Sequence, residues 1–360
     1  MAIIGTIMAV PAIFAFYCAW VVAMLLRPFF VFVLACLLWN APFTMLKMRM
    51  VADTFLYMFL CKDKKFKNPS DRGAFLSSLP SSSKKTIVFV RHGESCWNDT
   101  FNAGERKKLD FIKGFIPGLI KSFYYEVYLA LSGKVDSWFY DSPLSHYGIS
   151  QIDALARYLS KGPSSSSEQE VFDLLNGSPG CPKTSVLCSS NLRRALSTVC
   201  IGFRDRLASN PDEKIVVHPS LQEISRNPDT LSITPPGQQV NASWIEKASL
   251  PQIQPILTSR VDMTHHIGNK PLSSNGGTRM ASFCTFAFSR PEECVICGGH
   301  SLWFRSFFRA YLPEASGHIS KKKKMVNGGT VMFDLYKVKN GGGWEYVIDE
   351  KTMKVVYGGF

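Results

Sequence analysis

Charged residues are scarce in this sequence, at 19% against roughly 25% in soluble domains. The scarcity is uneven, because residues 1–46 contain a single charged side chain, Arg27. A stretch of that kind excludes an ordinary soluble enzyme. The hydrophobic content of 46% equally excludes a wholly disordered chain, which has too few apolar residues to build a core.

Two uncharged stretches, 2–26 and 28–46, make up the start of the chain. About 20 apolar residues are needed to cross a bilayer, so the first stretch is long enough and the second is borderline. A signal peptide fits poorly, since no basic segment comes first and the apolar length exceeds the usual ~7–15 residues. We predict a membrane anchor over 1–62, built as one span or as a hairpin turning at Arg27-Pro28, and a linker over 63–85.

Basic residues follow the apolar block, at Lys47, Arg49, Lys62, Lys64, Lys65 and Lys67. Positive residues beside a membrane segment favour the cytosolic side, so the catalytic domain is predicted to be cytosolic. A luminal orientation is the alternative, and the sequence leaves the organelle open.

Acidic residues are outnumbered, with 28 Asp and Glu against 41 Lys and Arg and a formal net charge of +13. This balance favours anionic partners such as a phosphorylated substrate or an acidic lipid bilayer. Nucleic acid is not expected, because no recognised binding module or aromatic interleaving accompanies the basic residues. The oligomeric state is left open.

Cysteines in a ligand-like arrangement are also lacking. The ten cysteines are scattered, and Cys294 and Cys297 have no second pair at zinc-ligand spacing. The pattern favours free thiols in a reducing compartment. We expect neither a metal nor a cofactor.

Short apolar, β-branched runs recur along the remaining chain, at 86–90, 185–188, 215–217 and 294–297. Helical patterns lie between them, as at 148–160 and 192–207. This alternation predicts an α/β fold over 86–360, a three-layer sandwich with a mostly parallel central sheet. Residues at about 99–140 are predicted to form a helical insertion. It either packs on the domain or caps the site and lies on the membrane.

Residues suited to phosphate chemistry follow each of the four runs. The first run ends in Arg91 and His92, the second leads to Arg194, the third to Glu223 and the fourth to His300. Ligand sites form at the carboxyl ends of parallel strands. Guanidinium and imidazole groups gathered there can hold a phosphoryl group and pass it to and from a histidine.

The residues around these positions resemble four motifs of the histidine phosphatase superfamily, the phosphoglycerate-mutase-like proteins. The segments are Arg91-His92-Gly93-Glu94-Ser95, Asp141-Ser142-Pro143-Leu144-Ser145 with Gly148 and Gln151, Ser189 to Thr198, and Gly299-His300-Ser301. They occur in the family's order and cover about residues 86–340. The third motif selects Arg194 over Arg193.

Charge and chemistry suggest a role for each of these side chains. A neutral His92 nitrogen would attack phosphorus. Arg91 and Arg194 would clamp the phosphoryl oxygens, and His300 would donate to the same oxygens. Glu223 would protonate the leaving oxygen and then deprotonate the attacking water. The resemblance implies the same catalytic set.

Four further residues are predicted to contact substrate: Asn98, Arg226, Asn227 and Ser301. Asn98 lies in the loop after His92, which it alternatively caps. The segment after Glu223 lacks the Gly-rich continuation common in mutases, which makes Arg226 and Asn227 candidates. Ser301 belongs to the second-histidine motif.

The sequence therefore predicts a membrane-tethered phosphatase that hydrolyses phosphate monoesters of a small molecule or a phosphoprotein. Two alternatives are a phosphoglycerate-type mutase and a non-catalytic membrane scaffold. The altered segment after Glu223 disfavours the mutase. The complete set of phosphate-binding residues disfavours the scaffold.

Overall fold

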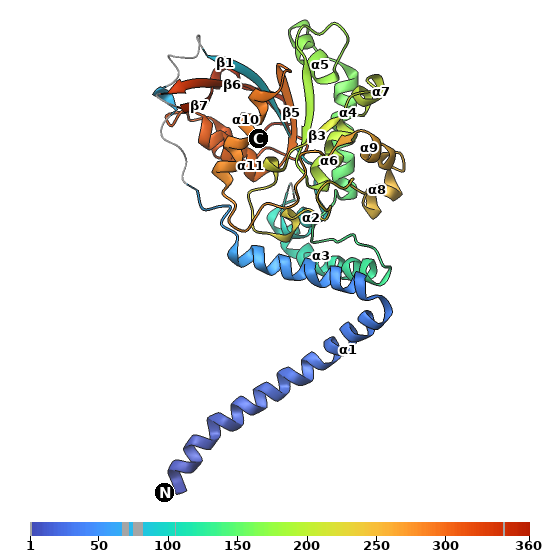
Figure 1. Ribbon diagram of the computed structural model, residues 1–360, viewed down its shortest axis with the longest axis vertical. Helices are drawn as coiled ribbons and strands as arrows, with labels where there is room; N and C mark the ends of the chain where they lie inside the picture. Colours follow the sequence, from blue (N-terminus) through green and yellow to red (C-terminus); the bar gives the residue numbers. More distant parts are fainter. Residues whose placement is uncertain (1, 67–71, 75–81, 105, 341–342) are drawn as a thin grey trace. The chain divides into compact units, whose positions relative to one another are not determined.

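The computed structural model describes residues 2–66, 72–74, 82–104, 106–340 and 343–360, without the side chains of 2–16, 18–19, 25–26 and 29. The chain divides into two compact units, 1–53 and 54–360 (Figure 1). Much of the predicted linker over 63–85 lies outside the described residues.

The first unit consists of most of helix α1, Ala2–Leu60, whose last two turns belong to the second unit. The helix continues through Arg27 and Pro28, so no hairpin turn forms there. Asn40 is the residue that leaves helical geometry, with φ −154° and ψ 83°. Within the described part of the chain, one segment, Phe30–Leu60, is long and apolar enough to cross a membrane.

The second unit is built on one eight-stranded sheet in the order β4-β3-β2-β5-β1-β6-β7, with β8 paired to β6. Neighbours from β4 to β1 are parallel, and β6 runs antiparallel to β1, β7 and β8. The sheet is therefore mostly parallel, as predicted. The strands are β1 Ser83–Arg91, β2 Ser185–Ser189, β3 Ile215–Val217, β4 Val261–Asp262, β5 Cys294–Gly299, β6 Thr330–Asn340, β7 Gly343–Ile348 and β8 Lys354–Tyr357.

Each predicted strand lies within one of the observed parallel strands, because these runs are buried on both faces. In β1, Val88 and Val90 join one hydrophobic cluster, whereas Ile87 and Phe89 join the other. Alternate residues of a strand point to opposite faces, so one cluster lies on each side of the sheet. The mixed α/β architecture is confirmed, and the three-layer sandwich stays a prediction.

Helices α4 and α6 contribute to the first cluster, and α10 and α11 to the second. The predicted helix over 192–207 is two helices, α6 and α7, which meet at Phe203. The helices of the second unit are α2 Cys96–Phe101, α3 Lys108–Leu131, α4 His146–Lys161, α5 Gln169–Asn176, α6 Arg193–Gly202, α7 Arg204–Ser209, α8 Trp244–Ser249, α9 Ile253–Ser259, α10 Gly276–Ser289 and α11 Ser301–Tyr311.

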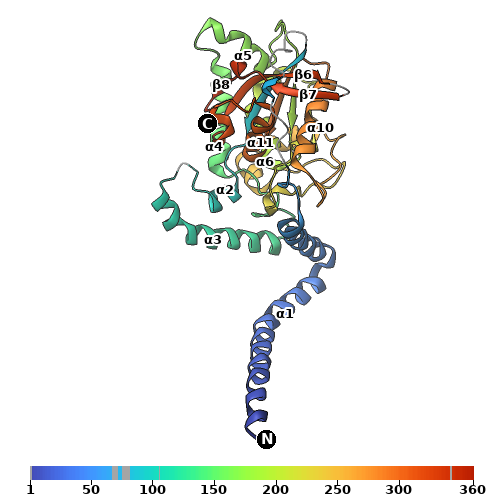
Figure 2. The same cartoon turned by 90° about the vertical axis from the view of Figure 1, so that its left-hand side faces the viewer.

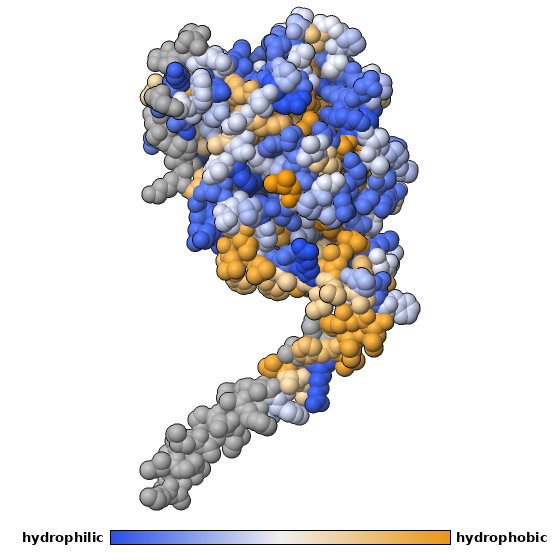
Figure 3. Space-filling view, viewed as in Figure 1, coloured by the Kyte–Doolittle hydropathy of each residue, from blue (hydrophilic) through white to orange (hydrophobic). Residues whose placement is uncertain are grey.

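The predicted insertion forms α2 and α3, which lie below the sheet in Figure 2. Helix α3 continues through Pro117 and is not split there. Its apolar residues remain largely exposed, with Ile116 at 59% and Ile120 at 66%. Apolar side chains accordingly gather along the lower edge of the second unit, where α3 and the last turns of α1 lie (Figure 3).

Candidate active site

Three parallel strands bring the predicted site residues to the end of the sheet where these strands have their carboxyl termini. Strand β5 lies between β1 and β2, and its register aligns Arg91 with Gly299 and Ser189 with Gly298. His92, Ser190 and His300 each follow one of these strands. Their positions at adjacent carboxyl ends therefore follow from strand pairing alone.

His92 is buried, and its two ring nitrogens have different partners. Nδ1 lies 2.5 Å from the Gly93 carbonyl oxygen, which can only accept, so Nδ1 carries the proton. Nε2 lies 3.3 Å from the Arg194 Nε donor and therefore acts as an acceptor. Burial, with the charges of Arg194 and Arg91, holds the pKa of His92 well below its usual range. The ring is thus neutral, with the Nε2 lone pair directed into the site.

Arg194 lies in the first turn of α6 and is 1% exposed. Its guanidinium donates to the Asp229 backbone carbonyl and pairs with the Asp229 carboxylate at 3.2 Å between Nη2 and Oδ2. Burial raises the pKa of Asp229 to about 6 against the opposing charge of Arg194. Asp229 was not predicted from the sequence, although it lies six residues after Glu223.

Arg91 ends β1 and contributes the second guanidinium. It donates from Nη1 to the Met325 carbonyl, whereas its buried Nε has no hydrogen-bond partner among the described residues. Burial lowers the pKa of Arg91 to about 10, with Glu223 opposing the shift and Arg194 adding to it. The group stays charged at neutral pH and has a donor available for a ligand oxygen.

His300 is fully buried at the N-cap of α11, and its ring centroid lies 5.2 Å from that of His92. Its Nε2 is 2.9 Å from the Ser190 hydroxyl, and its buried Nδ1 has no partner among the described residues. Burial and the charge of Arg194 hold the pKa of His300 well below its usual range. A neutral imidazole with an unused nitrogen suits hydrogen bonding to a phosphoryl oxygen.

Glu223 is 6% exposed and is held at the start of α11. Its Oε1 accepts from the backbone N–H groups of Trp303 at 2.8 Å and Ile224 at 2.9 Å, and its Oε2 accepts from Leu302 at 3.2 Å. Helix N-termini favour negative charge, so this carboxylate is fixed in position and electrostatically supported. The same helix start therefore places both His300 and Glu223.

Close backbone packing explains the glycines of the first two motifs. A Cβ at Gly93 would lie 2.5 Å from the Gly148 carbonyl oxygen, and one at Gly148 would lie 1.9 Å from the Glu94 carbonyl oxygen. The Gln151 side chain accepts from the Glu94 N–H at 2.8 Å and ties the His92 loop to α4. These motif residues fix the loop rather than reach the phosphoryl position.

Arg193 has a structural role, which its ion-pair and hydrogen-bond partners indicate. It pairs with Asp136 and donates to the Asp141 backbone carbonyl at 3.0 Å. The Asp141 carboxylate in turn accepts from the backbone N–H groups of Arg193 at 3.0 Å and Ile233 at 2.9 Å. The pair therefore links the loop before α4 to the start of α6.

The four other residues predicted to contact substrate differ in their burial and in their hydrogen-bond partners. Asn98 lies within α2 and accepts a hydrogen bond from Asn102 at 2.7 Å, whereas the Ser95 side chain caps the start of that helix. Arg226 is half-buried, with a buried Nε lacking a partner among the described residues. Asn227 is exposed, and Ser301 is buried in the first turn of α11. A substrate role for each stays a prediction.

A buried ion cluster beneath the Glu223 loop was missed by sequence reasoning. Lys270 donates to the backbone carbonyls of Glu223 at 2.5 Å and Ser225 at 2.7 Å, and pairs with Asp63 at 2.8 Å. Asp63 is fully buried and also pairs with Arg279 at 2.7 Å. Burial opposes ionisation of Asp63, but the two cations hold its pKa below the usual value. A residue just after α1 thus supports the loop that carries Glu223.

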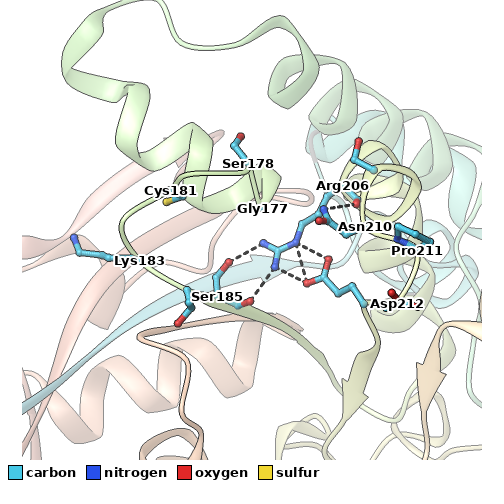
Figure 4. Close-up of a pocket in the computed structure, with 12 residues that line it drawn as sticks. Gly177, Ser178, Cys181, Lys183, Ser185, Arg206, Asn210, Pro211 and Asp212 are labelled. Carbon is cyan, nitrogen blue, oxygen red and sulfur yellow. Dashed lines mark hydrogen bonds and ion pairs between the residues drawn. The ribbon is translucent and has the colours of Figure 1, made fainter.

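Another cavity, of about 480 Å³, lies at the start of β2, away from the strand ends described above. Figure 4 shows Arg206 directed toward Ser185 across this cavity. The Arg206 guanidinium donates to Glu213 and to the carbonyls of Leu174, Leu175 and Ser185. These partners make it a structural residue that braces the loop after α5.

No group of three or more metal-ligating side chains occurs among residues the structure describes. Cys294 and Cys297 are both buried in β5, and burial raises the pKa of each thiol. Thiolates, which bind metals, are therefore disfavoured at both positions.

Comparison with known proteins gives structural matches only. No protein-family model and no curated protein sequence matches the chain. Similar solved structures include a mycobacterial glucosyl-3-phosphoglycerate phosphatase with VO3 (17% identity, 74% of this chain and 97% of that chain, TM-score 0.33). Others are the ecdysone phosphate phosphatase of Bombix mori with tungstate (15%, 73% and 92%, 0.34) and an Entamoeba histolytica phosphoserine phosphatase mutant (13%, 74% and 96%, 0.31). At these identities and TM-scores, neither substrate nor residue roles are transferred.

Proposed function

We propose that this protein is a phosphatase that hydrolyses phosphate monoesters through a phosphohistidine on His92. The observation that carries the proposal is the state of His92. Its Nδ1 proton is held by the Gly93 carbonyl, and its Nε2 lone pair faces the Arg194 guanidinium. A buried neutral imidazole facing a buried guanidinium is arranged to attack an anion that the guanidinium holds.

In the first step, His92 Nε2 forms a bond to phosphorus and the bond to the ester oxygen breaks. Arg91, Arg194 and His300 bind the non-bridging oxygens and stabilise the charge that develops on them. Protonated Glu223 gives its proton to the leaving alkoxide. The electron pair of the broken bond stays with that oxygen, so the product is a neutral alcohol.

In the second step, water attacks the phosphohistidine and the N–P bond breaks. Glu223, now ionised, accepts a proton from the water, which restores the starting enzyme and releases inorganic phosphate. Backbone N–H groups at the start of α11 keep the Glu223 side chain in place. A mutase would return the phosphoryl group to a second hydroxyl instead of to water.

The apolar segment Phe30–Leu60 supports the further proposal that the phosphatase is tethered to a membrane. Its length and composition are sufficient for a single span. The basic residues that follow favour a cytosolic catalytic unit.

Phosphate release from p-nitrophenyl phosphate and from alkyl monoesters tests the proposal. The detergent-solubilised full chain should turn over both, and His92→Asn should lose activity by several orders of magnitude. His146→Asn, at an exposed histidine, is the matched control and should remain active. Activity that requires priming by a bisphosphate would favour the mutase, and unchanged activity in His92→Asn would refute the nucleophile.

A further inference from the structure

A basic cavity of about 390 Å³ lies beside Glu223, outside the set of residues used in the proposed mechanism. It is lined by Lys64, Phe66, Ile224, Leu302, Arg305, Ser306 and Arg309. Three of these side chains are cationic and none is acidic. Its volume falls within the range of about 300–1,000 Å³ typical of small-molecule sites.

This cavity shares a wall with the proposed acid. Two lining residues, Ile224 and Leu302, are among the three whose backbone N–H groups bind the Glu223 carboxylate. A molecule in the cavity would therefore lie next to residues that hold Glu223. In the proposed mechanism Glu223 faces the leaving group, and the rest of the substrate extends from that group.

Helix α11 presents its cations to the cavity in a regular way. Leu302, Arg305, Ser306 and Arg309 recur at helical spacing and so lie along one face. Arg309 donates from Nε to the Lys321 carbonyl at 2.6 Å, which orients it. Arg305 is half-buried and forms no hydrogen bond or ion pair with the residues that the structure describes. Its guanidinium fork is available for an anion.

Positive charge continues from this cavity to the phosphoryl clamp. Burial lowers the pKa of Lys324, and the charges of Arg91, Arg305 and Lys64 lower it further, while Glu223 opposes them. The charges of Arg91, Arg305 and Lys64 therefore all act on Lys324, the last residue of the basic run at 321–324.

We propose that the cavity lined by Lys64, Arg305 and Arg309 is a second anion subsite, and that the substrate carries a further phosphate or similarly charged group beyond its scissile monoester. The inference rests on the proposed phosphatase function. Guanidinium groups bind phosphate through paired N–H donors, and the exposed Lys64 adds a point charge. Inorganic and organic monophosphates would fill the clamp alone.

Two sources could supply such a substrate, a soluble polyphosphorylated metabolite or a phosphorylated lipid headgroup. The chemistry is the same, a monoester whose alcohol carries a second phosphate. Lys64 follows the end of the apolar segment by four residues, so one wall of the cavity comes from membrane-proximal sequence. A headgroup at the bilayer surface would therefore be within reach of this residue.

The test uses the full chain in detergent or in vesicles and measures a specificity ratio. For the soluble source, kcat/KM is compared between inositol 1,4-bisphosphate and inositol 4-phosphate. For the lipid source, hydrolysis of phosphatidylinositol 4-phosphate in phosphatidylcholine vesicles is compared with that of inositol 4-phosphate. The ratio in either arm should exceed one, and Arg305→Gln or Lys64→Gln should lower it about tenfold, as expected for losing a charged hydrogen bond. Lys161→Gln, at an exposed lysine ending α4, should leave the ratio unchanged.

Ratios near one in both arms, or ratios unaffected by Arg305→Gln and Lys64→Gln, would overturn the subsite. Calorimetric titration of inositol 1,4-bisphosphate separates this outcome from failure of the phosphatase proposal. Binding that weakens in Arg305→Gln upholds the subsite even in a protein without turnover, and turnover without such binding upholds only the phosphatase.

Discussion

Helices α3 and α11 are both rich in apolar residues, and they differ in what covers those residues. In α11, Phe304 is 1% exposed and stacks on Phe89 of β1 with ring centroids 4.2 Å apart. In α3, Ile116 and Ile120 are more than half exposed. The helix that is sealed against the sheet also positions His300 and Glu223, whereas the exposed helix carries none of the catalytic candidates. The proposed catalytic residues and the exposed apolar surface therefore lie on separate elements of one unit.

The largest effect expected from this comparison is at Glu223, which the start of α11 holds in place. Glu223→Gln should lower kcat for alkyl phosphates by about 10²–10⁴, because an alkoxide leaves poorly without a proton. Aryl phosphates should be affected far less, since a phenolate leaves unaided. Steady-state kinetics with both substrate classes measures the difference, with Glu168→Gln at an exposed position as control. Equal losses for both classes would identify Glu223 as a structural residue.

The ion cluster beneath Glu223 should be the next most sensitive feature. Asp63→Asn leaves Lys270 buried without its carboxylate, which should lower the free energy of unfolding by about 3–5 kcal/mol. Asp53→Asn, at a partly exposed ion pair with Arg49, should cost less than about 1 kcal/mol. Denaturant unfolding in detergent measures both. Equal effects would show that Asp63 contributes no more than a surface charge.

Because of this ion cluster, activity after N-terminal truncation should depend on where the chain is cut. Removing residues 1–53 should leave an active second unit, and removing 1–66 should not, since the latter also deletes Asp63. Activity that survives the longer deletion would mean that the Glu223 loop holds its position without this support.

A smaller effect concerns pH. The unfolded chain binds a proton at His92 below its ordinary pKa of about 6.5, whereas the folded chain does not until well below that value. Protonation of His92 therefore does not affect the free energy of unfolding above about pH 6.5. Below that pH the free energy of unfolding falls, until the pH reaches the folded pKa. Between pH 7.5 and 5.5, wild type should lose about 1 kcal/mol more unfolding free energy than His92→Asn. Identical losses would place the folded pKa of His92 near its usual value.

The smallest effect on the fold is expected at α3. Ile116→Ser combined with Ile120→Ser should change the unfolding free energy by less than about 0.5 kcal/mol, because both side chains are already in solvent. Leu129→Ser, at a fully buried position of the same helix, should destabilise strongly. If α3 lies on the membrane, the double variant of a chain lacking 1–53 should bind anionic vesicles more weakly. Vesicle sedimentation decides between this hypothesis and simple packing on the domain.

Much of this arrangement could be predicted because it depends on local patterns. The strand runs are buried on both faces and read as continuous apolar segments, and parallel pairing then places the residues that follow them together. Asp229 and Asp63 could not be found in this way, because each acts through a partner far away in the sequence, Arg194 and Lys270. A lone Asp in a loop has no periodicity, and only the fold shows which cation it meets. The course of the chain at Arg27-Pro28 was likewise undecided, because proline is compatible with a turn and with a helix in apolar surroundings.

The central claim, nucleophilic attack by His92, is tested most directly by trapping the phosphoenzyme. The full chain is mixed with a ³²P-labelled monoester, quenched within milliseconds under alkaline conditions and digested. We predict label on the peptide that contains His92, stable in base and lost in acid, and none in His92→Asn. Label on any other residue, or turnover in wild type without a labelled intermediate on His92, would contradict the claim.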